Sequence, residues 1–215
     1  IPMVFTVSNA FKPMDEQFLF PPSLFVKNPT LMNFYSVSSL LRESWVPFTR
    51  YLFNSVFVTV VGTVGHVLIS SLAAYRIAKF EFPMKTVFFN LVVFSLMFSG
   101  AVTAIPNYLI MSELGLIDTL GAIIIPAFAA PLGLFLMKQF MEQMVPDALI
   151  EAAQIDGAGG MRIFLTIVMP IVKPAWFTLV IFSFRDLWNN TGGTFIFTEE
   201  LKTLPYALNN IATAA

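Results

Sequence analysis

The chain has 215 residues, of which 57% are hydrophobic and 12% are charged, roughly half the charged share of a soluble domain. Phenylalanine alone contributes 24 residues, so there is more apolar surface than so few charges can cover in water. This composition excludes an ordinary soluble enzyme, a disordered tail and a fibrous repeat. It indicates an integral membrane protein.

The residue counts exclude further classes. Twelve basic and 13 acidic residues give a net charge of −1, which argues against nucleic acid as the main partner because phosphate binding needs a basic excess. The chain has no cysteine and one histidine, so it has no disulfide, no thiol catalysis and little material for a metal centre. Motifs of the HExxH, GxSxG and GxxxxGK[ST] types are absent. We therefore expect no catalytic residue, no metal and no cofactor in this chain, and any nucleotide hydrolysis must come from another chain.

The first 50 residues begin apolar and then become irregular. Ile1–Val7 is apolar and is similar to the end of a helix whose beginning is missing. Residues 11–50 are rich in proline, serine and asparagine, which predicts an extramembranous segment with one short helix near Leu31–Leu41. We expect residues 1–50 to comprise the end of a first helix and an extracytoplasmic segment.

Three long runs without charged residues follow, at 51–75, 86–112 and 119–137. Each is long enough for a membrane-spanning helix, which needs roughly 20 apolar residues. A fourth apolar run, Ile171–Phe184, is interrupted near its start by Lys173 and Pro174. It continues through Arg185–Asp186 only if that pair faces protein or water. The predicted fold class is all-α, a polytopic transmembrane helical bundle with its core at residues 51–184.

Basic residues in the short loops predict the orientation. Segments 76–85 and 138–173 carry three basic residues each and segment 112–118 carries none, which places the first two in the cytoplasm and the third outside. Alternation then puts residues 8–50 and 185–215 outside, although the four basic residues of the first of these weaken the rule there. We expect residues 185–215 to be an extracytoplasmic loop before a missing last helix.

His66 lies in the middle of the first span, close to Gly62 and Gly65. It is either part of a proton relay or a polar helix-packing residue beside small neighbours, and we favour the packing interpretation.

Proline and glycine interrupt the later spans, at Pro106, Gly121, Pro126, Pro131 and Gly133. Irregular backbone at membrane depth needs protein or a water-filled cavity around it. These residues indicate either a translocation pathway or kinks that serve packing.

The stretch Val145–Ala175 has the most specific pattern. Pro146 suits the first turn of a helix, and Gly157 can end that helix in a left-handed conformation. A second helix is expected at Met161–Met169, stopped or kinked by Pro170 and Pro174.

Within the first of these helices, an i, i+3, i+4, i+7 spacing relates Leu149, Ala152, Ala153 and Asp156. The first three form a narrow face that another protein can approach closely. Physical reasoning alone leaves open whether the segment is a docking helix or an ordinary re-entrant loop.

This segment, residues 145–170, resembles the EAA loop of permease subunits of bacterial ABC importers. That pattern is Glu-Ala-Ala, three residues, Gly, nine residues, Ile, one residue, Leu and Pro. The matching residues are Glu151, Ala152, Ala153, Gly157, Ile167 and Pro170. Met169 stands where the pattern has Leu, which is a volume-conserving exchange.

The resemblance covers nearly the whole chain. Matching groups are Asn54–Ser55, Ala73–Ala74–Tyr75, Phe82–Pro83, Leu114–Gly115–Leu116 with Thr119, Asp156–Gly157, Trp188–Asn189 and Thr203–Leu204–Pro205. They stand in the order expected of the maltose-type second permease subunit of carbohydrate importers. Such subunits have six helices, so the resemblance implies a type I ABC importer permease that apparently lacks its first and last helices here.

The resemblance also implies a function. The chain would form half of a transmembrane pathway for a sugar or oligosaccharide in the bacterial inner membrane. Its partners would be a second homologous permease subunit, an ABC ATPase dimer that binds ATP and Mg, an extracytoplasmic sugar-binding protein and membrane lipid. The ATPase-coupling residues would be Glu151, Ala152, Ala153, Asp156, Gly157, Ile167 and Pro170.

Two other classes remain as alternatives. An intramembrane enzyme is disfavoured because the spans contain no acid–base or metal cluster. An ion-coupled carrier is disfavoured because the spans contain no Asp, Glu, Lys or Arg to bind a coupling ion.

Candidates for the sugar pathway lie near the outer side: Asn107, Tyr108, Trp188, Asn189 and Asn190. Trp188 and Tyr108 can equally belong to the interfacial aromatic belt, and the last two asparagines can be loop residues. No motif identifies the sugar.

Overall fold

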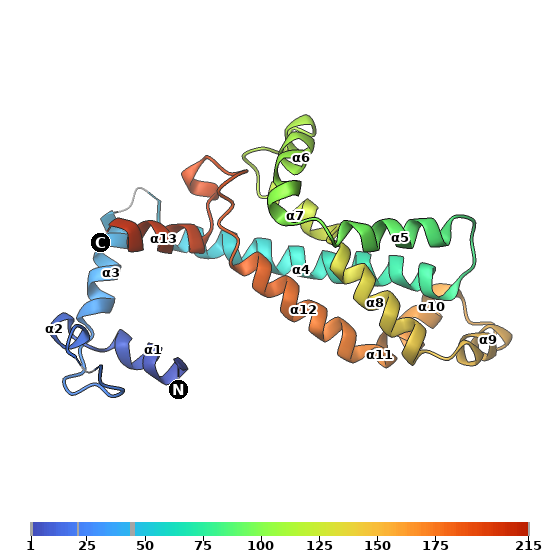
Figure 1. The fold of residues 1–215 in the computed structure, drawn as a ribbon, viewed down its shortest axis with the longest axis horizontal. Coiled ribbons are helices and arrows are strands. Elements are labelled where there is room, and N and C mark those ends of the chain that lie inside the picture. Colours follow the sequence, from blue (N-terminus) through green and yellow to red (C-terminus); the bar gives the residue numbers. More distant parts are fainter. Residues whose placement is uncertain (1, 21, 44–45, 215) are drawn as a thin grey trace. The chain divides into compact units, whose positions relative to one another are not determined.

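The structure is a computed structural model that describes residues 2–20, 22–43 and 46–214, and its regular secondary structure there is entirely helical (Figure 1). This confirms the predicted all-α class. The chain divides into two compact units, residues 1–49 and 50–215.

The first unit contains three short helices: α1 (Pro2–Ala10), α2 (Met14–Gln17) and α3 (Met32–Glu43). Buried Lys12 donates hydrogen bonds to Asn9 Oδ1 at 2.8 Å and to the Ser23 carbonyl at 2.5 Å. The carboxylate of Glu16 accepts from the backbone N–H of Lys27 at 2.9 Å. Charged side chains thus provide hydrogen-bond partners for backbone groups of the proline-rich segment between α2 and α3. The short helix predicted near Leu31–Leu41 is confirmed as α3.

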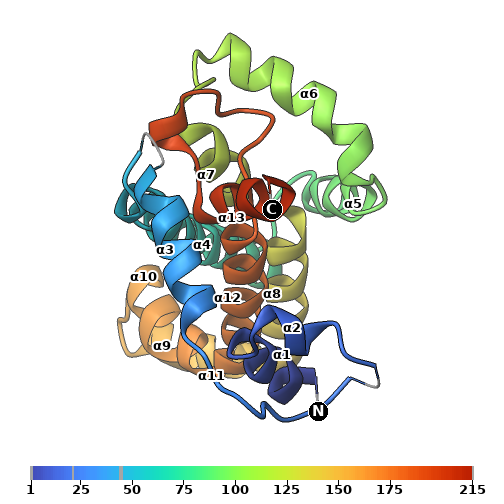
Figure 2. The ribbon, with the colours of Figure 1, turned by 90° about the vertical axis from the view of Figure 1, so that its left-hand side faces the viewer.

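The second unit is built on α4 (Phe48–Lys79), whose 32 residues give a length of about 48 Å. The other elements of this unit are α5 (Lys85–Ser95), α6 (Gly100–Glu113), α7 (Gly121–Phe128), α8 (Pro131–Met144), α9 (Asp147–Ile155), α10 (Gly160–Ile163), the π-helical turn η1 (Phe164–Val168), α11 (Met169–Ile171), α12 (Lys173–Trp188), the 3-10 turn η2 (Glu199–Leu201) and α13 (Leu204–Ala214). Helix α8 packs against both α5 and α12 (Figures 1 and 2).

Among the described residues, two helical stretches are long and apolar enough to cross a membrane: α4, and α7 with α8 over Gly121–Met144. Two bent pairs also qualify if each is one span: α5 with α6, bent by 112°, and Gly160–Ile171 with α12, bent by 81°. The prediction of a continuous span at 86–112 is therefore wrong in its geometry. Ser99 takes an extended conformation at the start of α6, and an apolar composition cannot distinguish one helix from two joined by a turn.

The end of the unit also differs from prediction. Helix α12 continues through Arg185 and Asp186, which are both exposed. They form an ion pair with 3.3 Å between Arg185 Nη2 and Asp186 Oδ1. Residues 204–214 were expected in a loop but form α13. Pro205 near its start has the fixed φ that suits a first turn, and leucine and alanine among the following residues favour a helix.

The larger core lies where α4, α8, α12 and the α9–η1 segment meet. Its buried residues are Val67, Ala74, Tyr75, Met137, Met141, Val145, Ile150, Ala153, Ile163, Phe164, Val168, Val172, Ala175 and Leu179. The Tyr75 ring lies 5.3 Å from the rings of both Phe80 and Phe164. A smaller core at the other end of α4 contains Val58, Ile123, Ile124, Leu187 and Ile196.

His66 connects three segments in the interior of this unit. Its Nδ1 is hydrogen-bonded to the Ser183 hydroxyl of α12, and its Nε2 lies 3.2 Å from the Ala130 carbonyl. Gly133 packs directly on the ring, since a Cβ added there would overlap His66 and Ser70. These contacts satisfy both ring nitrogens and support the packing interpretation of His66.

We predict that Gly133→Ala loosens this contact and destabilises the protein by about 1–3 kcal/mol, because the methyl group forces the buried ring to move. Gly100→Ala is the control, since an added methyl there meets nothing within 4 Å. Thermal unfolding in detergent should separate the two variants. Equal midpoints would contradict the close packing of Gly133 on His66.

Candidate functional site

The predicted coupling residues lie on α9 and the turn after it. The helix ends in a Schellman motif: the Ala158 N–H donates to the Ala153 carbonyl at 2.9 Å, and the Gly157 N–H donates to the Gln154 carbonyl at 3.0 Å. Gly157 has a φ of +80°, which confirms the predicted left-handed end. A Cβ at this glycine would meet no atom within 4 Å, so backbone strain alone disfavours a side chain there.

Helix α9 has one buried and one open face. Ile150 and Ala153 are buried in the larger core, so Ala153 does not share an open surface with Leu149 and Ala152 as the spacing suggested. The open face contains Glu151 and Ala152. Among the residues that the structure describes, Glu151 has no hydrogen-bond or ion-pair partner.

The open face of α9 continues into its last turn. Ile155 is 86% exposed there, and Asp156 beside it is also exposed. The open face of α9 thus combines two acidic residues with an exposed isoleucine.

The last two residues of the EAA pattern have a different place. Ile167 lies in η1 and packs against the larger core. Pro170 follows that wider π turn and precedes the 81° bend into α12. A proline ring collides with the carbonyl four residues back in a regular α-helix, and the π turn makes room for it. These two residues shape the support beneath α9 instead of adding to its open face.

A cavity of about 300 Å³ with a mainly apolar lining lies between α4, α6, α7 and α12, and we call it the polar cavity after the five polar residues that it contains. Its polar lining residues are His66, Asn107, Ser183, Asp186 and Asn190. The structure thus brings two predicted pathway residues, Asn107 and Asn190, to one cavity. Sequence analysis missed Ser183 and Asp186, although Ser183, Asp186 and Asn190 have the i, i+3, i+7 spacing of one helix face.

The other three pathway candidates do not line this cavity. The Trp188 ring stacks on Phe184 at 5.6 Å, and the Tyr108 ring stacks on Phe195 at 6.3 Å. The Asn189 side chain donates to the Arg185 carbonyl at 2.7 Å. A role of Tyr108, Trp188 and Asn189 in the pathway stays a prediction.

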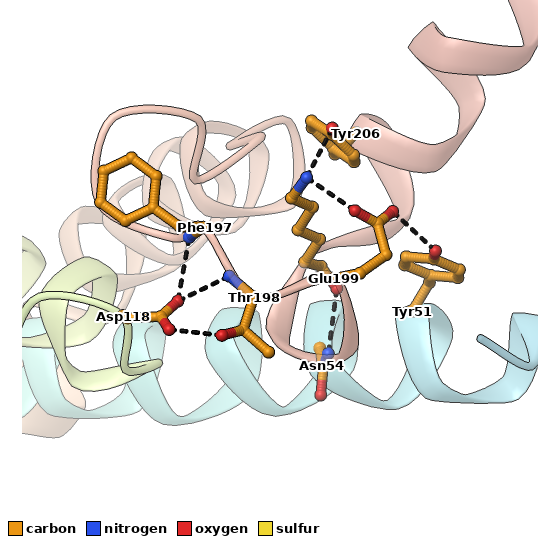
Figure 3. A network of polar contacts seen from close by, with 8 residues as sticks. Tyr51, Asn54, Asp118, Phe197, Thr198, Glu199 and Tyr206 are labelled. Carbon is orange, nitrogen blue, oxygen red and sulfur yellow. Dashed lines mark hydrogen bonds and ion pairs between the residues drawn. The ribbon is translucent and has the colours of Figure 1, made fainter. Parts of the chain in front are cut away.

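At the end of α4 opposite to α9, a polar network holds the loop between α12 and α13 (Figure 3). Glu199 accepts from the Tyr51 hydroxyl at 2.9 Å and from Lys202 Nζ at 2.7 Å. Lys202 also donates to the Tyr206 hydroxyl at 2.6 Å. Partial burial works against the charge of Glu199, but the hydrogen bonds from Lys202 and Tyr51 outweigh it and lower the pKa of this carboxyl.

Two neighbouring residues of α4 bind the backbone of the same loop. Asn54 Nδ2 donates to the carbonyls of Glu200 and Lys202 at 2.8 and 2.9 Å. The Leu204 N–H donates to Ser55 Oγ at 2.7 Å. The Asn54–Ser55 and Thr203–Leu204–Pro205 groups are thus in direct contact in the fold.

Asp118, in the loop between α6 and α7, also binds the backbone of the loop between α12 and α13. Its own N–H donates to the Phe195 carbonyl at 2.8 Å, and its carboxylate accepts from the N–H groups of Phe197 and Thr198 at 2.9 and 2.8 Å. The Thr198 hydroxyl donates to it as well and is the main cause of the lowered pKa of this carboxyl. Asp118 has a φ of +62°, a conformation that Asp and Asn tolerate better than most residues.

We predict that the hydrogen bonds from residues 197 and 198 to the Asp118 carboxylate weaken in acid. Because its folded pKa lies below the ordinary 3.8, its stabilising effect is present above that value and is lost as pH falls through the folded pKa. The protection factors of the Phe197 and Thr198 amides in hydrogen exchange should therefore fall as the pH drops below about 4. Asp118→Asn, which tolerates the same φ but carries no charge, should remove the pH dependence. Constant wild-type protection, relative to the buried Val172 amide, would contradict this role.

Residues 66–209 match the family model described as "Binding-protein-dependent transport system inner membrane component". This range includes the His66 contacts, the polar cavity, the whole of α9 and the loop between α12 and α13.

Several curated proteins are similar in sequence. The sn-glycerol-3-phosphate transport system permease protein UgpE of Yersinia enterocolitica is 38% identical over 143 residues, which are 66% of this chain and 50% of that protein. Protein LplC of Bacillus subtilis is also 38% identical, over 66% of this chain and 48% of its own length. The chain spans about half the length of these two relatives. A putative ABC transporter permease protein, ORF2, of Caldicellulosiruptor sp. is 31% identical over 95% of this chain and 71% of its own length.

The fold resembles a chain in the crystal structure of a bacterial ABC transporter involved in the import of the acidic polysaccharide alginate, with a TM-score of 0.80. The two chains are 22% identical, and the likeness covers 99% of this chain and 73% of that one. It supports the predicted fold of an ABC importer permease. Since the family model matches more than half of the chain, the chain belongs to the inner membrane components of binding-protein-dependent transport systems.

Proposed function

We propose that this chain is a permease subunit of an ATP-binding-cassette importer and forms half of the pathway by which a sugar or oligosaccharide enters a bacterial cell. The observation that carries the proposal is α9, a short helix with an open face on a chain of this family. In this proposal the chain does no covalent chemistry. An ATPase dimer that binds ATP and Mg drives transport, and an extracytoplasmic binding protein delivers the solute.

The open face of α9 is the proposed ATPase contact. Ile155 and Leu149 are 86% and 45% exposed, and an apolar partner groove would remove both from water. Burying a side chain of this size contributes about 1.5–3 kcal/mol. Glu151 lies between them in sequence and would pair with a basic residue of the ATPase. Gly157 sets the angle at which the chain leaves this contact.

A second, homologous permease subunit is proposed to complete the pathway, related to this chain by pseudo-twofold symmetry. A groove of about 860 Å³ with mainly apolar lining runs between α4, α5, α6 and the α7–α8 segment. Four or so spans with such an open groove do not enclose a path for an oligosaccharide. Another membrane subunit and lipid would cover the apolar surface.

The polar cavity is the proposed part of the pathway in this chain. Asn107 and Asn190 offer amide donors and acceptors, and Asp186 offers an acceptor. Asp186 in the lining is paired with Arg185 at 3.3 Å, so amide, hydroxyl and carboxylate groups there suit a hydroxylated solute.

Purification of the native assembly in detergent, followed by native mass spectrometry, tests the proposal. We expect one copy of this protein, one other permease chain and two copies of an ATPase with a phosphate-binding loop. A lone polypeptide that transports without ATP would refute the proposal. Two copies of this protein with no other membrane subunit would refute the proposed heterodimer.

We predict that Glu151→Ala leaves the protein in the membrane but lowers sugar-stimulated ATP hydrolysis by about tenfold or more, because a basic partner left buried and unpaired costs about 2–5 kcal/mol. Gly157→Asp should have a similar effect, since a side chain at positive φ costs roughly 1–2 kcal/mol and tilts the end of the helix. Gln143→Ala, an exposed position of α8, is the control. Normal coupling and ATPase retention in both variants would overturn the role of α9.

We predict that Asn107→Ala raises the KM for transport of the sugar by roughly three- to tenfold, the effect of losing one neutral hydrogen bond, without loss of assembly. Asn209→Ala, an exposed asparagine on α13 away from the cavity, is the matched control. Uptake of labelled sugar by intact cells gives KM and maximal rate separately. If Asn107→Ala transports with the KM of the control, the cavity is not part of the pathway.

A further inference from the structure

The inner end of α4 is tied to the start of α9 by one buried side chain. Lys79, the last residue of α4, donates from Nζ to the Val145 carbonyl at 2.6 Å and to Asp147 Oδ1 at 2.7 Å. The Lys79 side chain is 4% exposed, whereas that of Asp147 is 76% exposed. A lysine so deeply buried is unusual unless its charge is compensated.

The surroundings compensate this charge from three helix ends. Lys79 lies at the carboxyl end of α4, where the helix dipole favours a cation, and Asp147 lies at the amino end of α9, where it favours an anion. The Val145 carbonyl belongs to the single turn that joins α8 to α9. One ammonium group therefore holds the ends of α4, α8 and α9 together.

Among the residues that the structure describes, Lys79–Asp147 is the only ion pair between α9 and another helix. Apolar contact provides the other attachment, since Ile150 and Ala153 pack in the larger core. Apolar contacts permit sliding, whereas two short hydrogen bonds to one ammonium group fix both distance and direction.

The opposite end of α4 is also fixed, because Asn54 and Ser55 bind the backbone of the loop before α13. Between these two ends α4 is continuous and carries no proline. The continuous helix α4 would therefore transmit a displacement of α9 at Lys79 to the loop before α13.

We propose that Lys79 is a positioning residue that makes α9 and α4 move as one body, so that movement at the cytoplasmic end reaches the outer loop held by Asn54 and Ser55. This proposal rests on the proposed function, since it assigns to α9 a movement that the ATPase would impose. Lys79 itself touches neither nucleotide nor solute.

The test uses the intact protein with its accompanying subunits in lipid nanodiscs. Lys79→Met keeps most of the length of the side chain and removes its charge and donors. Lys85→Met is the matched control, because Lys85 lies at the start of α5, at the other end of the short loop that follows Lys79, and its ion pair among the described residues is with its neighbour Glu81. Lys79→Arg retains charge and donors, and Asp147→Asn weakens the ion pair while leaving the bond to the Val145 carbonyl in place.

Amide exchange over residues 147–158 reports on the attachment of α9 without any need for transport. We expect exchange there to rise about tenfold in Lys79→Met, the effect of losing a hydrogen bond to a charged group, less in Asp147→Asn, and not in Lys85→Met. Lys79→Arg should restore most of the protection. Wild-type exchange in both Lys79→Met and Asp147→Asn would overturn the proposal, and Asp147→Asn keeps it testable if Lys79→Met does not assemble.

The number of sugar molecules imported per ATP hydrolysed is the second measurement. We expect Lys79→Met to lower this ratio severalfold while the ATPase stays bound, and Lys79→Arg to recover it. An unchanged ratio with faster α9 exchange would show that Lys79 only stabilises the fold and would refute the coupling role. If the wild-type assembly contains no ATPase, the proposed function fails, whereas the exchange experiment still decides whether Lys79 positions α9.

Discussion

The need of a backbone in lipid to bond its own polar groups governs this structure. One helix, α4, meets this need along its whole length, whereas the bent segments do not cross in a single straight piece. The other parts of the second unit are arranged on it. Asn54 and Ser55 hold the loop between α12 and α13, His66 joins the middle of α4 to α12 and Ala130, and Lys79 holds the start of α9.

The broken elements gather where this helix can support them. The break between α7 and α8 exposes the Ala130 carbonyl, which His66 approaches, and the π turn before Pro170 packs on Tyr75 through Phe164. At these two breaks the irregular backbone is thus covered by polar or aromatic groups of α4. The polar cavity opens beside the first of these breaks, which links the proline and glycine pattern to the proposed pathway.

Periodicity and spacing were sufficient to predict the helical class, the long first span and the glycine end of α9, because each depends on a local pattern. They failed where the outcome depends on distant contacts. The 112° turn near Ser99 and the inward position of Ala153 are set by tertiary packing. Asp118 and Lys79 were not singled out as site residues, since a lone charge in a loop or at a helix end shows nothing of the backbone groups that it will bind 66–80 residues away. Asn107 and Asn190 were predicted from residue type, but only the fold brings them to one cavity.

The central claim is that α4 and α9 form one rigid body in the working transporter. Spin labels at Leu72 of α4 and Gln154 of α9, both exposed in the chain, allow the distance between these helices to be measured in nanodiscs with and without trapped ATP. The account predicts one narrow distance distribution that is the same in both states, while distances from Gln154 to a label on the partner ATPase change. A shift or broadening of the Leu72–Gln154 distance on ATP binding would contradict it.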